Sequence, residues 1–173
     1  MGDDHCRVNT IDEISVHEVL ANLLDFRTRW IKGTAICASP SSTATFRVEA
    51  WSLEGRWTSE NATTGATTSY TAATQLMMRG ESEVFRPPYP ILPADESVSL
   101  AFPLALPIWG RTRDDFMPVS AERVNDEAVM LLRHRTDQQI FGSLVVNLAR
   151  GHATRLLTPM SSVQLVDLVG HQV

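Results

Sequence analysis

The densest polar cluster in the sequence is Arg-Thr-Arg-Asp-Asp at residues 111–115, directly after a proline-rich apolar stretch. Two carboxylates beside two guanidinium groups are the residue types needed for general acid–base catalysis next to an anion clamp. In an extended strand, Asp114 and Asp115 would point to opposite faces, so they would not act as a dyad. The alternative is a solvated loop whose charges neutralise one another, as surface ion pairs commonly do.

A second group of polar side chains alternates with apolar ones over residues 44–52, which predicts a strand. Arg47, Glu49 and Trp51 share one face of that strand. If the sheet curves so that this face lies inside, these groups would face a ligand; otherwise they face water, opposite the apolar side. Trp51 favours the first arrangement, because a lone tryptophan on a polar face prefers cover.

His134 lies between Arg133 and Arg135. The two positive charges disfavour protonation of the imidazole and would keep it available as a neutral base. Together with the groups above, this yields five candidate catalytic residues: Arg47, Glu49, Arg111, Asp114 and His134.

The sequence contains no motif for a metal or a cofactor. No histidine has a second histidine or a carboxylate at ligand spacing, and there is no nucleophile elbow, P-loop or dinucleotide-binding glycine motif. Lys32 is the only lysine, which argues against Schiff-base chemistry with a pyridoxal cofactor. The other basic residues are arginines, as is typical of a GC-rich bacterial genome. We therefore expect neither a metal nor a cofactor.

Aromatic side chains are the candidates for lining an apolar ligand pocket. Each of them alone also fits an ordinary hydrophobic core, so the pocket depends on the fold rather than on any one residue. The predicted ligand-binding residues are Trp30, Trp51, Tyr70, Phe102 and Trp109.

Composition and charge exclude several classes of protein. The chain has 173 residues with 15 basic and 20 acidic side chains, so its net charge is −5 and no basic cluster suits nucleic acid. The longest apolar stretch, 100–109, is interrupted by two prolines and is too short to span a bilayer. The N-terminus has no secretory signal pattern, so we expect a cytoplasmic protein, unless an export signal was trimmed. Cys6 and Cys37 form no metal-binding or redox motif, and Cys37 is expected to be a small buried residue.

One helix is predicted, over residues 11–24. Thr10 and Glu13 match a capping box, and the apolar residues that follow fall on one stripe with helical spacing. The residue pattern predicts strands over most of 26–86 and 119–169. Tight turns join these strands and favour antiparallel pairing.

Residues 87–118 differ in character, because they hold seven of the nine prolines together with many large apolar residues. Such a segment either packs over a sheet face or closes a cavity as a loop with short helices. The expected fold is mainly β (α+β). It is a single domain over 1–173, with a curved antiparallel half-barrel sheet of eight or nine strands and one N-terminal helix.

This order of elements resembles the LolA/LppX-type lipoprotein carriers. The resemblance rests on Phe-Arg-Val-Glu at 46–49 leading to Gly55-Arg56, and on Ser-Leu-Val-Val at 143–146 leading to 151–156. It implies a curved sheet that wraps a helix and encloses an apolar cavity. The same fold is known in a cofactor-independent violacein-pathway enzyme, so it does not separate a carrier from a catalyst.

Three functional hypotheses follow. The first is a protein that binds a hydrophobic small molecule or acyl chain between sheet and helix. The second is a cofactor-independent enzyme of specialised metabolism that uses the same cavity. The third is a subunit that docks a protein partner through the apolar segment at 98–109. Self-association stays open in all three, and nucleic-acid binding and a membrane span are not expected.

Overall fold

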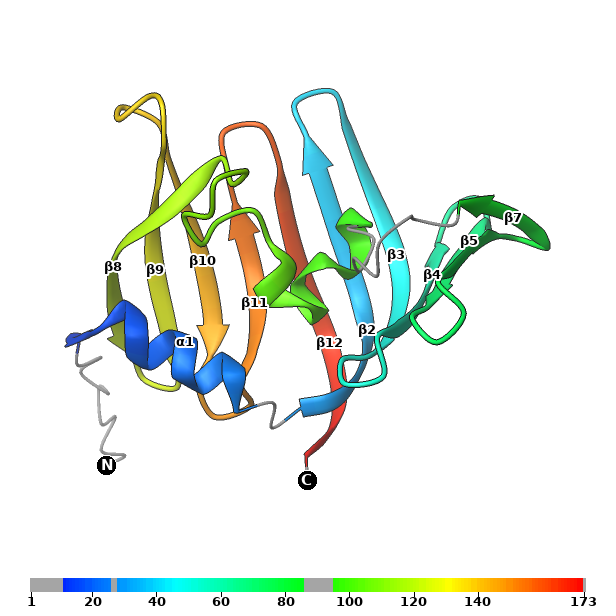
Figure 1. The fold of residues 1–173 in the computed structure, drawn as a ribbon, viewed down its shortest axis with the longest axis horizontal. Coiled ribbons are helices and arrows are strands. Elements are labelled where there is room, and N and C mark those ends of the chain that lie inside the picture. Colours follow the sequence, from blue (N-terminus) through cyan, green and yellow to red (C-terminus); the bar gives the residue numbers. More distant parts are fainter. Residues whose placement is uncertain (1–10, 26–27, 86–94, 173) are drawn as a thin grey trace, which may run out of the picture.

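The computed structural model describes residues 11–25, 28–85 and 95–172. All the strands in this part of the chain belong to one 12-stranded antiparallel sheet, in the spatial order β1-β8-β9-β10-β11-β12-β2-β3-β4-β5-β6-β7 (Figure 1). The strands are β1 (Ile11–Ile14), β2 (Thr28–Ser39), β3 (Ser42–Trp51), β4 (Arg56–Asn61), β5 (Thr67–Thr71), β6 (Leu76–Arg79), β7 (Ser82–Phe85), β8 (Phe116–Val124), β9 (Glu127–His134), β10 (Phe141–Asn147), β11 (His152–Leu157) and β12 (Ser162–Gln172).

The sheet joins two meanders through its C-terminal strand. β12 pairs with both β11 and β2, so strands β2–β7 extend from one side of it and β11–β8 from the other. Every neighbouring pair is antiparallel; short turns join most of these pairs, as expected, whereas the pairs β12–β2 and β1–β8 bring together strands far apart in the sequence. The sheet is open and is not closed into a barrel, because β1 and β7 are its two edges among the described residues.

The prediction of eight or nine strands is too low. Within the predicted strand region 26–86, a turn in which Gln75 has a φ of 54° separates β5 from β6, and the apolar pattern did not indicate this turn. An additional strand, β1, also forms where the sequence indicated the first turn of the helix. Both differences arise from the backbone conformation at a turn or strand end, and the spacing of apolar residues does not predict that conformation.

The helix is shorter than predicted: α1 covers Val16–Leu24, not residues 11–24. Its N-cap is Ser15 rather than Thr10; Ser15 Oγ accepts a hydrogen bond from the Glu18 N–H (3.1 Å), and Glu18 Oε2 accepts one from the Ser15 N–H (2.9 Å). Both positions match the capping-box pattern. Residues 11–14 instead pair with the edge of β8, where unpaired backbone groups are available. Because these residues are in a strand, the helix begins after them, with the capping box of Ser15 and Glu18.

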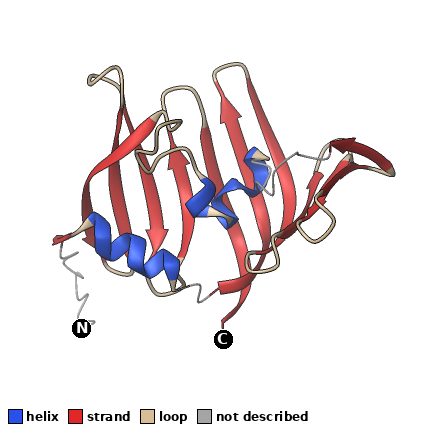
Figure 2. Ribbon diagram, in the orientation of Figure 1, coloured by secondary structure: helices blue, strands red, loops and turns tan. Residues whose placement is uncertain are grey.

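The helical segments cover one face of the sheet, which we call the inner face (Figures 1 and 2). α1 crosses β8 to β11, and its Asn22 Nδ2 donates to the Leu148 carbonyl (2.9 Å). The 3₁₀ segments η1 (Glu96–Ala101) and η2 (Pro103–Ala105) lie over the centre of the sheet. The part of the proline-rich stretch that the structure describes therefore packs over a sheet face, which is one of the two arrangements expected for it.

The hydrophobic core lies between the inner face and these helical segments. Val19 and Leu23 of α1 are buried, and so are Val98 and Leu100 of η1. Cys37 is also buried on the inner face of β2, as predicted, and burial together with the nearby Glu96 and Asp95 raises the pKa of its thiol to about 12. The sheet contributes inward side chains at alternate positions, among them Ile31, Val48, Ala50, Trp57, Met130, Leu132, Leu144 and Val146.

One glycine in the sheet is required for close packing of its strands. A Cβ atom on Gly142 of β10 would lie 2.6 Å from the backbone oxygen of Leu157 in β11. Replacing Gly142 with alanine would force the two strands apart, because backbone atoms offer no flexible way to relieve the contact. We expect Gly142→Ala to lower the free energy of unfolding by about 1–3 kcal/mol in a urea titration.

The control for this substitution is Ser143→Ala on the same strand. Ser143 is half-buried and already carries a Cβ, so its change should alter the unfolding free energy by less than about 0.5 kcal/mol. Equal urea midpoints for the two variants would show that β10 and β11 are not held this close.

Candidate ligand pocket

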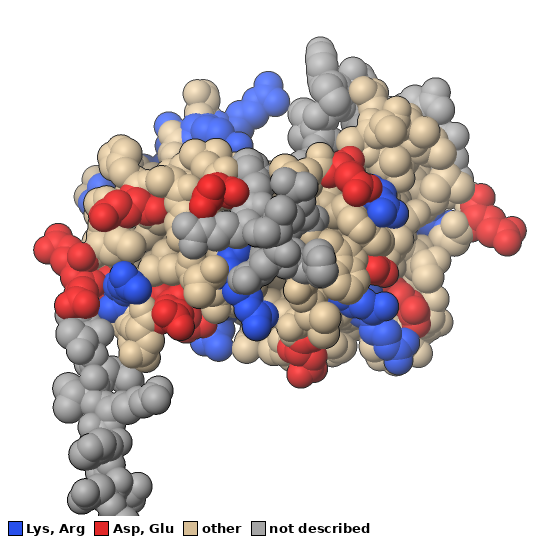
Figure 3. Space-filling view, turned by 90° about the horizontal axis from the view of Figure 1, so that it is seen from below, with Lys and Arg blue, Asp and Glu red and all other residues tan. Residues whose placement is uncertain are grey.

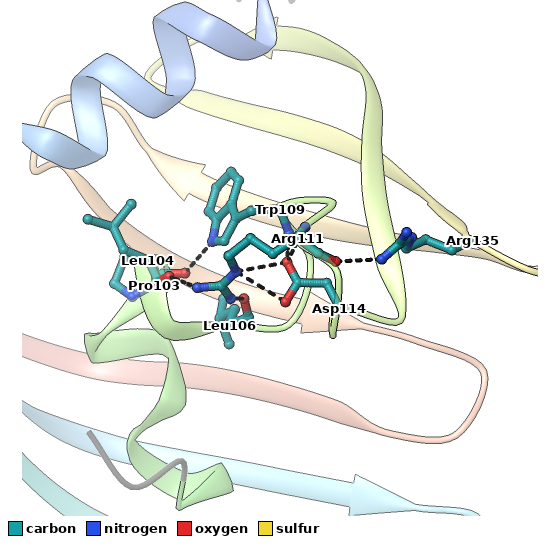
Figure 4. A network of polar contacts seen from close by, with 7 residues as sticks. All are labelled: Pro103, Leu104, Leu106, Trp109, Arg111, Asp114 and Arg135. Carbon is teal, nitrogen blue, oxygen red and sulfur yellow. Dashed lines mark hydrogen bonds and ion pairs between the residues drawn. The ribbon is translucent and has the colours of Figure 1, made fainter. Parts of the chain in front are cut away.

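The polar cluster at 111–115 folds as a loop before β8, with Asp114 at its centre (Figure 4). Asp114 is 7% exposed. Its Oδ2 atom accepts hydrogen bonds from the backbone N–H groups of Trp109 (2.9 Å) and Arg111 (3.0 Å). Arg111 Nε also donates to both carboxylate oxygens, at 3.1 and 3.0 Å. Burial raises the pKa of Asp114, but these hydrogen bonds outweigh burial and hold its pKa below the usual value.

The guanidinium group of Arg111 extends this network into the proline-rich segment. It donates to the carbonyl oxygens of Leu104 (3.2 Å) and Leu106 (2.5 Å), while Trp109 Nε1 donates to the Pro103 carbonyl (2.9 Å). Arg135 of the segment after β9 donates in turn to the Arg111 carbonyl (Figure 4). The side chains of Arg111 and Asp114 thus form hydrogen bonds within their own loop, and these bonds connect η2 to the start of β8.

His134 lies close to this loop, at the end of β9. Its Nδ1 atom accepts a hydrogen bond from the Asp137 N–H (3.2 Å) and contacts Thr136 Oγ1 (3.1 Å), and its ring packs edge-on against Phe116. Asp114 and His134 line a common open groove with residues 112–115 and 134–136. The structure therefore brings these two predicted residues to one place, with each already engaged in local hydrogen bonds.

Arg47 and Glu49 lie elsewhere, on the outer face of β3, opposite the buried Val48 and Ala50. Arg47 forms an ion pair with Glu60 (2.7 Å), and Glu49 accepts a hydrogen bond from Trp30 Nε1 (2.9 Å). They line an open groove of about 490 Å³. The structure does not bring them together with Arg111 and Asp114, because the sheet separates the two groups.

The predicted aromatic residues are also divided between the two faces. Trp30 and Trp51 are register partners on the outer face, where the Arg56 guanidinium lies 3.6 Å above the Trp51 ring. Tyr70 is buried on the inner side, with its ring 6.3 Å from that of Trp57. Trp109 is half-buried in the loop described above.

An apolar cavity of about 180 Å³ lies on the inner face, between the end of α1, the η1–η2 segment and the sheet. Of the five predicted ligand-binding residues, Phe102 lines this cavity. The described residues that form the wall are Leu23, Ile31, Ser52, Ala101, Phe102, Pro103, Leu104, Ala105, Gly151 and His152. The wall is mostly apolar; its polar side chains among the described residues are Ser52, whose Oγ donates to the Ala101 carbonyl (3.1 Å), and His152.

His152, the first residue of β11, is 5% exposed. Its Nδ1 atom is buried and has no hydrogen-bond partner. Burial lowers the pKa of the imidazole to about 4, and the charge of Arg150 acts in the same direction, while a hydrogen bond between the imidazole and the backbone of Arg150 opposes them. The ring is therefore neutral at pH 7.

Sequence reasoning missed His152 as a functional candidate. The pairing of β10 with β11 shifts register between Val145 and Val146, and Thr154 is left out of the ladder. This bulge leaves Ala153 and Leu156 on the same face, three residues apart, and His152 at the start of β11 is buried as well. Alternation of polar and apolar residues carries no signal for such a bulge.

Charged side chains of both signs are interspersed over the face of the molecule shown in Figure 3. This distribution agrees with the absence of a basic cluster in the sequence. Within the described residues, no helix is long and apolar enough to cross a membrane.

No protein-family model and no curated protein matches the sequence. Among solved structures, the chain is similar to an uncharacterised conserved protein from Thermus thermophilus, with a TM-score of 0.55 and 12% identity over 91% of this chain and 88% of that one. It is also similar to MucB in complex with MucA(peri), with a TM-score of 0.46 and 14% identity over 91% of this chain and 56% of that one. A structure of MucB alone has a TM-score of 0.45. The first similarity shows that the overall fold recurs in another protein.

Proposed function

We propose that this protein binds a small hydrophobic molecule, or the end of an acyl chain, in the cavity between α1, the η1–η2 segment and the sheet. The observation that carries the proposal is the apolar wall around a volume of about 180 Å³. A cavity of ~150 Å³ with an apolar lining stays dry and holds a benzene-sized molecule. The volume is below the ~300–1,000 Å³ of pockets for drug-sized ligands, so the part of the ligand inside is small.

The proposal includes a carrier of the LolA/LppX type. Two features support it: helical segments cover one face of an open antiparallel sheet, and an apolar cavity lies between these layers. A carrier needs only burial of apolar surface to hold its cargo, and that is what this cavity offers.

Catalysis in the same cavity is the competing function, and the pKa of His152 argues against it. A general base works best when its pKa is near the working pH. The pKa of about 4 makes His152 a weak base at neutral pH. Among the described residues, no other titratable side chain lines the cavity. Binding is therefore favoured over catalysis.

The hypothesis of docking through the 98–109 segment loses its basis in the described structure. Most apolar side chains of that segment face the sheet, with Val98, Leu100 and Ile108 each at most 1% exposed. They contribute to the core and leave little apolar surface for a partner.

The ligand itself can be sought by native mass spectrometry of protein purified from its own host without organic solvent. A co-purifying apolar mass that is released on unfolding would support the proposal and define the ligand class. Protein that is empty but bound to another polypeptide would contradict it.

A cavity-filling substitution tests where the ligand binds. Ala105, on η2, is half-buried and lines the cavity. We expect Ala105→Phe to weaken toluene binding by at least about tenfold, because the new ring occupies the space that toluene needs. Chemical-shift changes in ¹H–¹⁵N spectra during a toluene titration measure the affinity.

Ala62→Phe is the matched control, because Ala62 is exposed in the turn after β4, and it should leave toluene binding unchanged. Equal toluene affinity in Ala105→Phe and Ala62→Phe would place the binding site outside this cavity.

A further inference from the structure

The outer face of strands β8 to β11 carries large apolar side chains that the protein leaves in contact with water. They alternate with buried residues along their strands, so they point away from α1 and the η1–η2 segment. An antiparallel sheet that faces water on one side normally has polar residues there, and clustered apolar side chains mark an interaction surface. The members of this outer apolar patch, each 36–49% exposed, are Met117, Val129, Leu131, Phe141 and Leu157.

Strand β9 carries one charge of each sign on the same face, at the two ends of the patch. Its outward residues are, in order, Glu127, Val129, Leu131 and Arg133. At about 3.4 Å per residue, Glu127 and Arg133 lie about 20 Å apart, so they do not pair with each other. The ion pairs among the described residues involve neither of them. Both charges are therefore available to a partner that lies against the patch.

A second copy of this chain has the complementary pattern when it is turned end for end. A two-fold axis that lies between two facing sheets, perpendicular to their strands, places β9 of one copy antiparallel to β9 of the other. Glu127 of each copy then lies opposite Arg133 of the other, and Val129 lies opposite Leu131. A two-fold axis along the strands would place like charges opposite each other, which is unfavourable. Two-fold dimers are the commonest oligomers, and sheets pack face to face about 10 Å apart.

The neighbouring strands fit the same orientation. The register places Glu122 of β8 and Arg155 of β11 in one row with Val129. In the two-fold arrangement, this row faces the row of Leu131 in the other copy. On β8 to β11, the row of Leu131 contains serine and leucine side chains only, so neither charge meets a like charge.

We propose that the outer apolar patch is the interface of a two-fold homodimer in which the β9 strands of the two copies run antiparallel to each other. Burial of the apolar side chains supplies the affinity, and the Glu127–Arg133 pairs at both ends set the orientation. This interface lies on the opposite face of the sheet from the cavity. It goes beyond the proposed function and depends on different residues, so either proposal can fail without the other.

Sedimentation velocity of the wild-type protein from about 1 to about 300 µM tests self-association, and we expect a dimer that forms with increasing concentration. Leu131→Glu should weaken the dimer by at least about tenfold, because it buries an unpaired charge in the patch of each copy. Leu53→Glu is the matched control, because Leu53 is 53% exposed in the turn after β3, and it should dimerise like the wild type. A wild type that stays monomeric, or a Leu131→Glu variant that dimerises equally well, would overturn the proposal.

Charge reversals on β9 test the orientation. Glu127→Arg and Arg133→Glu should each weaken the dimer by at least about tenfold, because like charges then meet at both ends of the interface. An equimolar mixture of the two variants should form a heterodimer about as strong as the wild-type dimer, since each variant has one sign of charge at both positions and the signs are opposite.

Native mass spectrometry distinguishes the heterodimer from the two homodimers by mass. Recovery of association on mixing cannot come from a folding defect, so the readout does not depend on the stability of either variant. Arg79→Glu, at an exposed position of β6, is the control for net charge and should dimerise like the wild type. If the mixture associates no better than each variant alone, the two-fold arrangement is wrong.

Discussion

Between pH 7 and pH 4 we expect the protein to lose up to about 3 kcal/mol of unfolding free energy because of His152 alone. The pKa of this imidazole is about 4 in the folded protein, against an ordinary value of 6.5. Each unit of difference corresponds to about 1.4 kcal/mol. As the pH falls below about 6.5, the unfolded chain binds a proton at His152 that the folded protein does not, so acid favours unfolding.

The sign and the range of this effect are both specific. Above the unfolded pKa, His152 is neutral in both states and contributes no pH dependence. The loss of stability grows as the pH falls through the interval between the two pKa values and is complete below about 4. Urea unfolding at several pH values from 7 to 4 measures it.

The variant His152→Phe isolates this contribution from the titration of carboxylates in the same range. Its unfolding free energy should fall less steeply with pH than that of the wild type, by the amount above. His17→Phe, on the exposed side of α1, should keep nearly the wild-type slope. Parallel pH profiles for wild type and His152→Phe would mean that water reaches the ring and that the cavity wall is not closed around it.

Removing the Asp114 carboxylate should destabilise the protein by about 2–4 kcal/mol. Asp114→Ala leaves the backbone N–H groups of Trp109 and Arg111 without their acceptor, and it leaves the Arg111 guanidinium without its ion pair. Since Arg111 also holds the carbonyls of Leu104 and Leu106, the segment that roofs the cavity would loosen with it. Urea unfolding at pH 7 measures the stability, and a toluene titration of the same variant reports on the cavity.

Asp115→Ala is the natural control, because Asp115 is the neighbouring residue, has the same charge and is exposed. It should change the unfolding free energy by less than about 0.5 kcal/mol. The hydrogen bonds hold the pKa of Asp114 below its usual value of 3.8, so its contribution is present at neutral pH and declines only at more acidic pH. If Asp114→Ala and Asp115→Ala are equally stable at pH 7, the loop network does not support the fold.

The candidate site was only partly predictable from the sequence, because the pattern of side chains along a strand does not show which face of the sheet is covered. Alternation correctly grouped Arg47, Glu49 and Trp51 on one face of β3, but it did not tell which face the helical segments cover. That choice depends on where the η1–η2 segment packs. Phe102 was predicted as a ligand-binding residue and lines the cavity, whereas His152 was overlooked because the polar and apolar pattern around it does not predict that a histidine at the first position of β11 is buried.

The start of helix α1 could not be predicted from local sequence either. Two Ser/Thr-x-x-Glu patterns lie within a few residues, and local physics favours each of them. The helix begins at Ser15 rather than at Thr10 because β1 pairs with β8, a strand about 100 residues further along the chain.

The amino-acid sequence alone therefore determined most of the antiparallel strands and their turns, the apolar character of the proline-rich stretch and the absence of known cofactor motifs. These follow from the period of side chains and from turn residues, whose effects act within a few positions. The placement of β12 between β11 and β2, the use of Arg111 and Asp114 to hold a loop, and the burial of His152 beside a cavity emerged only from the folded chain. The first and the third depend on contacts between distant segments, and the second depends on the conformation of a loop; none of these leaves a periodic pattern in the sequence.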